Sequence, residues 1–159
     1  EWGSGSSGWL YKYKMRGLMA RIYGVEFDVS YKADFATISA DYSSVFGNNI
    51  SEGIPLPYIP PSMTRIKLTY NKIKNFTPTL QIIKASSQSR LGEFEQPTDG
   101  YTIVDLFGSY DLNLGNGSHK IIFQFDNIYD EVHYNHLSKI KLIMPEMGRS
   151  ISVQYRFLF

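Results

Sequence analysis

The stretch Gly24-Val25-Glu26-Phe27-Asp28-Val29-Ser30-Tyr31-Lys32 decides the fold class, because apolar and polar side chains alternate along it. Successive side chains of a β-strand point to opposite faces, so this pattern is typical of a strand with one apolar and one polar face. Apolar residues occupy most odd positions back to Trp9, although Arg21 interrupts them. We therefore expect a strand within the region Trp9–Tyr31.

The same alternation returns in six further segments and predicts an all-β chain, an antiparallel meander of about seven strands without helices. The apolar members are Ala36, Ile38, Ala40 and Tyr42; Ile66, Leu68 and Tyr70; Phe76, Leu80 and Ile82; Val104, Leu106, Tyr110 and Leu112; Ile121, Phe123 and Phe125; and Ile151, Val153, Tyr155, Phe157 and Phe159.

The connections between these segments alternate in length. Residues 32–35, 71–75 and 113–118 are short and carry Asn, Asp and Gly, which suit tight turns. Residues 46–62, 86–100 and 129–148 are long and rich in Pro, Gly and polar side chains. Short turns at one end and long loops at the other are the layout of an outer-membrane barrel, with periplasmic turns and extracellular loops.

Composition excludes several classes of function. Lys and Arg number 16 against 15 Asp and Glu, and a net charge of +1 supplies no field for general nucleic-acid binding. The absence of Cys excludes disulfide frameworks, thiolate zinc sites and cysteine nucleophiles. Residues 1–8 are rich in Gly and Ser, so we expect a flexible linker or an engineered scar there, in a processed product or fragment.

Several short segments stand out along the second half of the chain. They are Leu56–Pro61, Gly92–Glu95 followed by Pro97–Thr102, Val104-Asp105, Asp126–Asp130, Tyr134–Ser138 and Pro145–Arg149. In this order and spacing they resemble the C-terminal barrel strands of TonB-dependent outer-membrane receptors, especially the branch that includes zinc, haem and siderophore importers. Each segment also has a purely structural reading; Asp99-Gly100, for example, is ordinary turn chemistry.

The resemblance implies that residues 9–159 are the C-terminal segment of a 22-stranded transmembrane β-barrel in the bacterial outer membrane. Seven strands alone leave two unpaired sheet edges, which lipid does not tolerate. We therefore expect the remaining strands and the plug of the receptor, in a separate chain or cut away, as partners. The resemblance further implies contact with TonB through the plug, with the barrel-assembly machinery, and with outer-membrane lipid and lipopolysaccharide.

The end of the chain is expected to act as the signal for barrel insertion. Its alternating apolar residues finish on an aromatic side chain, as in the outer-membrane proteins that the assembly machinery recognises. A last strand that simply closes a barrel would have the same pattern, and the two readings are compatible. The residues concerned are Ile151, Val153, Tyr155, Phe157 and Phe159.

The sequence offers no catalytic constellation, since it has no nucleophile elbow, no phosphate-binding Gly loop and no His-Glu-x-x-His segment. We therefore expect neither an enzyme nor a bound cofactor. His133 and His136 have a spacing that can serve a metal ion, although histidines in such loops are more often solvated or hydrogen-bonded. Tyr58, Tyr129 and Tyr134 are candidates to line a ligand vestibule.

Two functions remain open at this point. The first, implied by the resemblance, is part of a TonB-dependent receptor that imports a scarce nutrient such as a metal ion, haem or a siderophore into the periplasm. The second is a stand-alone small β-barrel, lipocalin-like or a small outer-membrane protein, that binds an apolar ligand. The two differ in which face of the sheet is apolar: the outside in a membrane barrel, the inside in a lipocalin.

Overall fold

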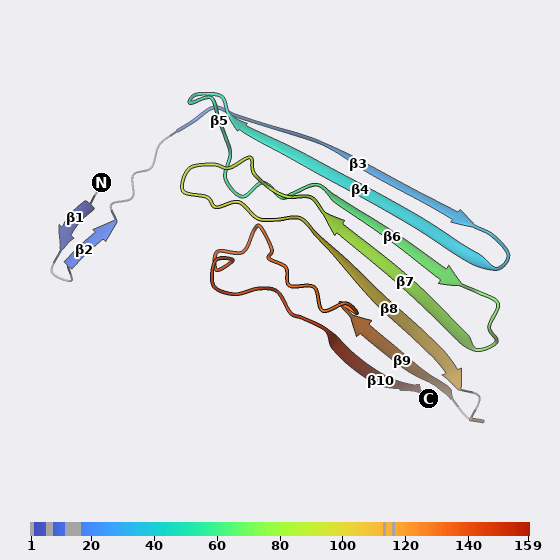
Figure 1. Cartoon of the computed structure of the whole chain (residues 1–159). Coiled ribbons are helices and arrows are strands. Elements are labelled where there is room, and N and C mark those ends of the chain that lie inside the picture. The colour runs from blue at the N-terminus through green and yellow to red at the C-terminus, as the bar shows by residue number, and fades with distance from the viewer. Residues whose placement is uncertain (1, 6–7, 12–16, 113, 116) are drawn as a thin grey trace.

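The computed structural model describes residues 2–5, 8–11, 17–112, 114–115 and 117–159. Seven strands form one antiparallel sheet in the order β10-β9-β8-β7-β6-β4-β3, and a short strand, β5, pairs with β4. Figure 1 shows the long loops at one end of this sheet and the short turns at the other. The strands are β3 (Ala20–Lys32), β4 (Ala36–Asn49), β5 (Ile54–Pro55), β6 (Met63–Tyr70), β7 (Phe76–Ala85), β8 (Tyr101–Leu112), β9 (Ser118–Asp126) and β10 (Ser150–Leu158).

The cross-strand register aligns the apolar residues of all seven strands on one face. One row runs Val29, Ala40, Ile66, Ile82 and Val104 from β3 to β8. Next to it, Leu106, Phe125 and Ile151 are paired in turn across β8, β9 and β10. Because directly paired residues of an antiparallel sheet share a face, the alternation in each strand adds up to one continuous apolar surface.

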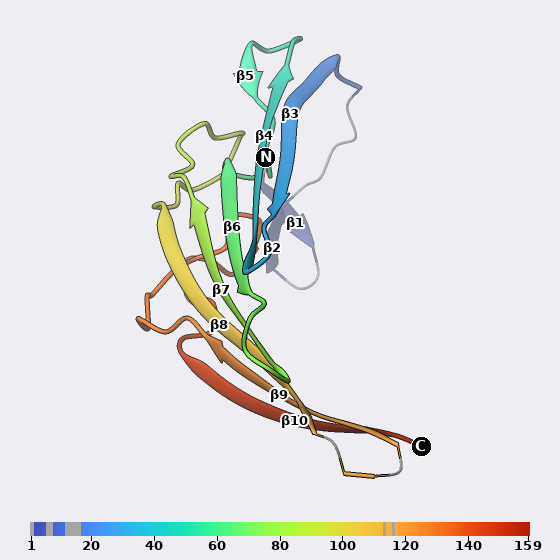
Figure 2. The same cartoon turned by 90° about the vertical axis from the view of Figure 1, so that its right-hand side faces the viewer.

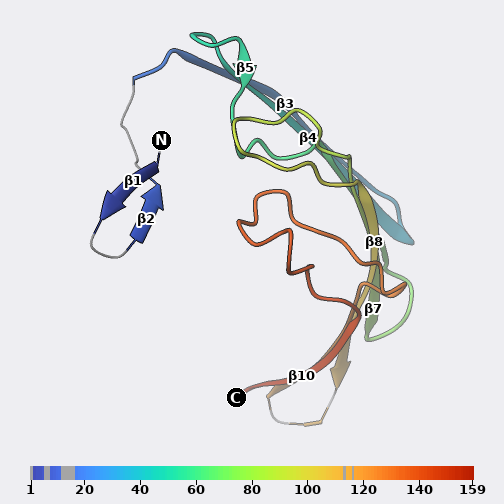
Figure 3. The same ribbon diagram turned by 60° about the vertical axis from the view of Figure 1, so that its left-hand side comes forward.

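The opposite face is polar and is the more buried of the two. Gln81 and Asp105 on this face are almost fully buried, whereas their neighbours Leu80, Ile82 and Leu106 on the apolar face are exposed. The sheet is twisted and curved (Figure 2), and the long loop after β9 folds over its concave side (Figure 3). The apolar face is therefore the convex, outward one, as in a membrane barrel and opposite to a lipocalin.

The sheet is open, since β3 and β10 lie at its two edges and do not pair with each other. The described residues also lack a large apolar core: the buried hydrophobic residues are Ala36, Ala85 and Ile103 alone. An isolated small barrel with an apolar interior would need both a closed sheet and inward apolar side chains. The structure therefore does not fit the second of the two functions that the sequence left open.

Two expected boundaries differ from the structure at the beginning of the chain. Residues 1–8 were expected to be a linker, but Trp2–Gly5 (β1) pairs antiparallel with Gly8–Tyr11 (β2). The long first strand expected over Trp9–Tyr31 is divided, and β3 begins at Ala20; Tyr13 and Met15 of that expectation lie outside the described residues.

The second strand is longer than its alternation predicts. β4 continues from Tyr42 to Asn49 because it remains paired with β3 along its whole length. Phe46 keeps the apolar parity and its ring stacks on Tyr23 of β3, with centroids 5.4 Å apart. Among the described residues, no helix is long and apolar enough to cross a membrane.

Candidate functional site

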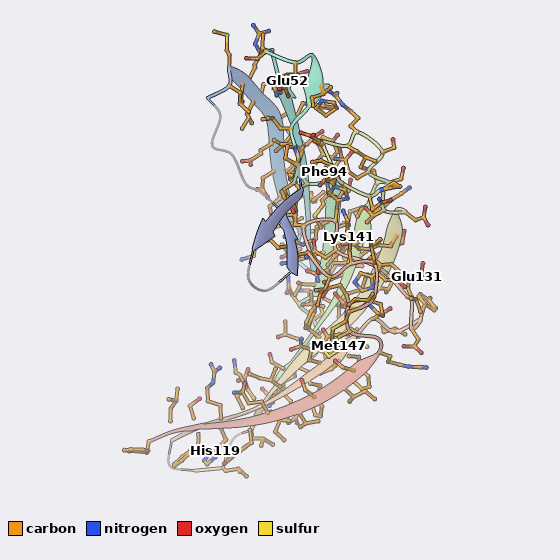
Figure 4. The ribbon with its side chains drawn as sticks, turned by 90° about the vertical axis from the view of Figure 1, so that its left-hand side faces the viewer. Glu52, Phe94, His119, Glu131, Lys141 and Met147 are labelled. Carbon is orange, nitrogen blue, oxygen red and sulfur yellow. The ribbon has the colours of Figure 1, made fainter. Side chains whose placement is uncertain are left out.

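Three long loops converge at one end of the sheet, and we name them loop A (50–62), loop B (86–100) and loop C (127–149). Loop A follows β4, loop B joins β7 to β8, and loop C joins β9 to β10. Figure 4 shows Phe94 of loop B and Lys141 of loop C in this region, and His119 at the opposite end of the sheet. The loops together form the best candidate for a functional site, because they bury polar side chains between them.

The carboxylate of Glu95 ties the three loops together. Its Oε1 accepts a hydrogen bond from the backbone N–H of Tyr58 in loop A at 2.9 Å, and its Oε2 accepts one from the N–H of Gly92 in loop B at 3.0 Å. Oε1 also lies 3.0 Å from Nε2 of His136 in loop C. The Glu95 side chain is 4% exposed and that of His136 0%, so the contact lies in the protein interior.

His136 is held from both sides of its ring. Its Nδ1 lies 2.9 Å from the hydroxyl of Thr98 and 3.3 Å from Nζ of Lys141, and Nζ also donates to the carbonyl of His136 at 3.0 Å. An ammonium group only donates, so Nδ1 must accept, and the proton of the neutral ring is then on Nε2. Nε2 lies close to the Glu95 carboxylate and interacts with it electrostatically, but the geometry is not that of a hydrogen bond.

The pKa values of His136 and Glu95 are both lowered, which favours a neutral imidazole beside a charged carboxylate. Burial lowers the pKa of His136, the nearby Lys141 ammonium lowers it further, and Glu95 opposes both without reversing them. Burial acts to raise the pKa of Glu95, but hydrogen bonds from Gly92 and Tyr58 and the electrostatic interactions with His136 and Lys141 outweigh it and lower that pKa. The cluster is therefore an ammonium, a neutral imidazole and a carboxylate, with no net charge.

Loops A and B approach each other so closely that only glycine fits at position 92. A Cβ atom on Gly92 would lie 2.3 Å from the backbone nitrogen of Pro57. On either side of this contact, Tyr58 and Phe94 have φ angles of 58° and 61°, in the left-handed region that costs bulky residues about 1–2 kcal/mol. The hydrogen bond from Tyr58 to Glu95 stabilises this conformation and leaves both aromatic rings exposed.

Loop C is anchored to the sheet by its own polar contacts. The N–H of Asn127 donates to Oδ1 of the buried Asp105 at 2.9 Å, and Oδ2 of Asp105 accepts from Gln81 at 2.8 Å. At the far end of the loop, Oδ1 of Asp130 accepts from the N–H of Arg149 at 2.8 Å. These bonds secure the loop at both ends and leave its middle to the cluster around His136.

The structure separates the two histidines predicted from the sequence as metal ligands. His136 has both ring nitrogens engaged within the cluster, whereas His133 is outside it, with its ring against Tyr101 at 4.5 Å between centroids. In the part of the chain that the structure describes, no three His, Cys, Asp or Glu side chains are grouped to hold a metal ion. Metal binding by this pair stays a prediction, and the observed contacts of His136 are structural.

The three tyrosines predicted to line a vestibule lie in the converging loops. Tyr58 is in loop A, and Tyr129 and Tyr134 are in loop C; all three are exposed. Phe94, which the sequence did not single out, is 94% exposed at the tip of loop B. Their role in ligand binding stays a prediction.

The predicted insertion signal lies on the last strand of the sheet. Its four members within the strand share the apolar face, since each of them pairs with a β9 residue on that face, and all five members are exposed. Recognition by the assembly machinery stays a prediction. The members are Ile151, Val153, Tyr155 and Phe157 in β10, and Phe159 directly after it.

The sequence did not identify the residues that hold His136 in place. Glu95 and Thr98 lie within segments already noted for their resemblance, and so does His136, yet nothing in their spacing shows that these segments meet. Lys141 carried no signal of its own. These segments are far apart in the chain and have no common sequence pattern. Only the contacts between the loops bring them together.

Comparisons with known proteins agree with this geometry. The TonB dependent receptor-like β-barrel family matches residues 5–128. A solved structure of a protein named copper transporter OprC is similar over 99% of this chain, with a TM-score of 0.84 and 23% sequence identity. The chain spans about a quarter (26%) of that protein's length. A comparison with curated proteins gives no match.

Proposed function

Because the chain belongs to the TonB-dependent receptor β-barrel family of the bacterial outer membrane, we propose that it is part of an importer that moves a scarce nutrient into the periplasm. The family is one of receptors and transporters rather than enzymes. In this proposal the chain supplies a section of the barrel wall and three extracellular loops. The plug and the other strands complete the receptor, and TonB acts through the plug.

The observation that carries the proposal is the polarity of the two sheet faces. The convex face presents a continuous apolar surface that suits lipid, while the concave face carries charged and amide side chains that suit a hydrated or plugged lumen. The three loops fold over the concave side at the end where a ligand would enter from outside the cell. A barrel wall of this kind contributes to transport by enclosing the lumen through which the cargo passes, and this role needs no catalytic group.

Among the possible cargoes we place a metal ion first, ahead of haem and siderophores. The similar solved structure is named a copper transporter. Loop C also presents exposed Met144 and Met147 side chains and the half-buried His133, and thioether and imidazole groups are donors that copper accepts. The cargo travels through the whole receptor, so these residues are candidates for its first contact.

The test is uptake by cells that carry the complete receptor. Uptake of radioactive copper, zinc, ferric siderophore and haem would be compared in cells with the receptor, without it, and with the receptor but lacking TonB. We expect one cargo to accumulate only when both the receptor and TonB are present. Accumulation that does not depend on TonB, or none above the receptor-free cells for any cargo, would overturn the proposal.

A further inference from the structure

The buried cluster around His136 balances one carboxylate with one cation. Oε1 and Oε2 of Glu95 each accept a backbone hydrogen bond, and the positive charge near them comes from Lys141, which is itself almost fully buried. The His136 side chain has no exposed surface. Because a buried charge is costly unless it is paired, this interior accommodates one cation beside Glu95 and not two.

The ring of His136 is placed so that it can supply the positive charge instead. Oε1 of Glu95 lies 3.0 Å from Nε2, and the hydroxyl of Thr98 lies 2.9 Å from Nδ1. A hydroxyl group accepts as well as donates, so a ring protonated on both nitrogens would have an acceptor beside each of them. Neither acceptor depends on Lys141. The cluster therefore has a second way to balance the charge of Glu95.

Lys141 is incompatible with a protonated His136 ring. Its Nζ lies 3.3 Å from Nδ1, and an ammonium group has no lone pair to accept the N–H that a proton would create there. The two positive charges would also repel each other, and burial leaves them little screened. Among the described residues, the charged groups that face the ring are Glu95 from loop B and Lys141 from loop C, while loop A contributes the N–H of Tyr58, which bonds to Glu95.

Proton binding by His136 and departure of Lys141 therefore favour each other. Burial lowers the pKa of His136, and the Lys141 ammonium lowers it further, so the ring binds a proton more readily once Lys141 has left. By thermodynamic linkage, a proton on the ring favours the departure of Lys141 to the same extent. The result is two arrangements of the cluster, each with one cation beside Glu95 and no net charge.

Lys141 also ties the tip of loop C, residues 138–144, to the cluster. Its Nζ donates to the carbonyl of His136 at 3.0 Å. Across the part of the chain that the structure describes, the other hydrogen bonds of this tip stay within residues 135–144, as from the N–H of Met144 to the carbonyl of Ile140 at 3.0 Å. Ile143 and Met144 are exposed. Loss of the Lys141 contact therefore releases the tip.

From these observations we propose that the cluster is a proton-dependent switch, in which an acidic medium protonates His136, the imidazolium replaces Lys141 as the cation beside Glu95, and Lys141 moves into water with the tip of loop C. Glu95 keeps its bonds to Tyr58 and Gly92, so loops A and B stay together and only the tip moves. Loop C folds over the concave side of the sheet (Figure 3), so its release opens the loop end of the barrel. This regulation is independent of the cargo.

The test measures distances between the loops of the complete receptor in lipid vesicles. This chain contains no Cys, so nitroxide labels on Glu93→Cys in loop B and Ile143→Cys in loop C, both at exposed positions, are unique within it. Double electron–electron resonance would follow their separation from pH 7.5 to pH 5. We expect a second, longer distance whose population relative to the first rises by up to about tenfold per pH unit. A label pair between loops A and B, Ile50→Cys with Glu93→Cys, should keep its distance.

Three variants assign the response to the cluster. His136→Gln cannot gain the proton, so its distance should not change between pH 7.5 and pH 5. Lys141→Gln lacks the ammonium that holds the tip, so it should show the longer distance already at pH 7.5. Lys139→Gln removes an exposed lysine of the same tip and is the matched control, which should respond to pH as the wild type does.

A wild-type distance that is the same at pH 7.5 and pH 5 would overturn the proposal, as would a pH response that His136→Gln retains. An increase of both label distances together would also overturn it, because the whole cluster would then come apart instead of exchanging its cation. If His136→Gln does not assemble, Lys141→Gln replaces it as the deciding variant. A wild-type pH response in Lys141→Gln would contradict the role of Lys141.

Discussion

The wall of the sheet and the loops above it differ in which side chains they bury. In the wall, apolar side chains are exposed on the convex face, and an ion pair such as Asp41–Arg65 on the other face is 44% and 40% exposed. In the loops, Glu95 and His136 form a pair that is 4% and 0% exposed. The same chain thus places its hydrophobic groups outside and its tightest polar contact inside.

This difference follows from the two solvents around the molecule. Lipid accepts apolar side chains directly, so the wall needs no apolar core and can leave its polar groups to water in the lumen. The three loops contribute none of the buried hydrophobic residues of the described chain, so they have no apolar core of their own. They are held instead by buried hydrogen bonds and charges, which are costly unless every partner is present.

The largest expected effect comes from removing the carboxylate that joins the loops. Glu95→Ala should weaken the arrangement of the loops by about 3–5 kcal/mol, because His136 and the N–H groups of Tyr58 and Gly92 lose the carboxylate that they contact, and the nearby Lys141 ammonium loses its opposite charge. Amide hydrogen exchange in the complete receptor would show faster exchange across loops A, B and C. Exchange in β7 and β8 should stay slow.

The matched control for that experiment is Glu93→Ala. Glu93 is an exposed carboxylate in the same loop, so its removal should change loop exchange by much less than that of Glu95. If the two variants show the same amide hydrogen exchange in the loops, the buried cluster does not hold the loops together. The proposed difference between wall and loops would then be wrong.

A charge on the convex face tests the wall in the same way. Val153 is near the middle of β10 and pairs with Phe123 on the apolar face, so Val153→Arg should destabilise the barrel in a bilayer by about 2–4 kcal/mol. Urea unfolding of the complete receptor in lipid vesicles would measure this loss. Gln154→Arg, one residue further on the polar face, should have a much smaller effect, and equal losses would contradict the assignment of faces.

The smallest expected effect is a pH dependence confined to the loops. Burial and Lys141 lower the pKa of His136 below 6.5 in the closed state, so the opened state binds the proton more readily. Loop stability is therefore complete above pH 6.5 and falls by up to about 1.4 kcal/mol per pH unit as the pH drops toward the lowered pKa. Glu95, whose pKa is also lowered, adds a second loss only below pH 4.5.

Hydrogen exchange of loops B and C between pH 7.5 and pH 5 would measure this dependence after correction for intrinsic exchange rates. His136→Gln keeps a polar side chain but cannot gain the proton, so its loops should show no such change across this range. A loop stability that is independent of pH in the wild type would indicate that His136 is not the titrating group.

The extent to which the sequence predicted the structure differs between the same two regions. All seven strands of the main sheet were predicted, and the pairing confirms that their apolar sets share one face. The pairing of Trp2–Gly5 with Gly8–Tyr11 and the extension of β4 to Asn49 were not predicted. In both cases the pairing depends on a partner strand, which the residues of one strand do not indicate by themselves.

The candidate site was predicted only in part, and the reason is physical. The sequence pointed to Tyr58, Tyr129 and Tyr134 because a loop tyrosine is visible in the sequence by itself, and to His136 as a possible metal ligand; the structure places all four in the converging loops, and both roles stay predictions. Glu95, Thr98 and Lys141 were missed, since each matters only through a residue in another segment.

The sequence by itself determined which segments are strands and which side of each is apolar, because the direction of a side chain along a strand is a local property of the backbone. Only the tertiary structure decided that the apolar side is convex, that Glu95 meets His136, and that Arg90 lies over the ring of Phe46. Curvature and contacts between loops depend on how distant segments pack, and no period in the chain encodes that packing.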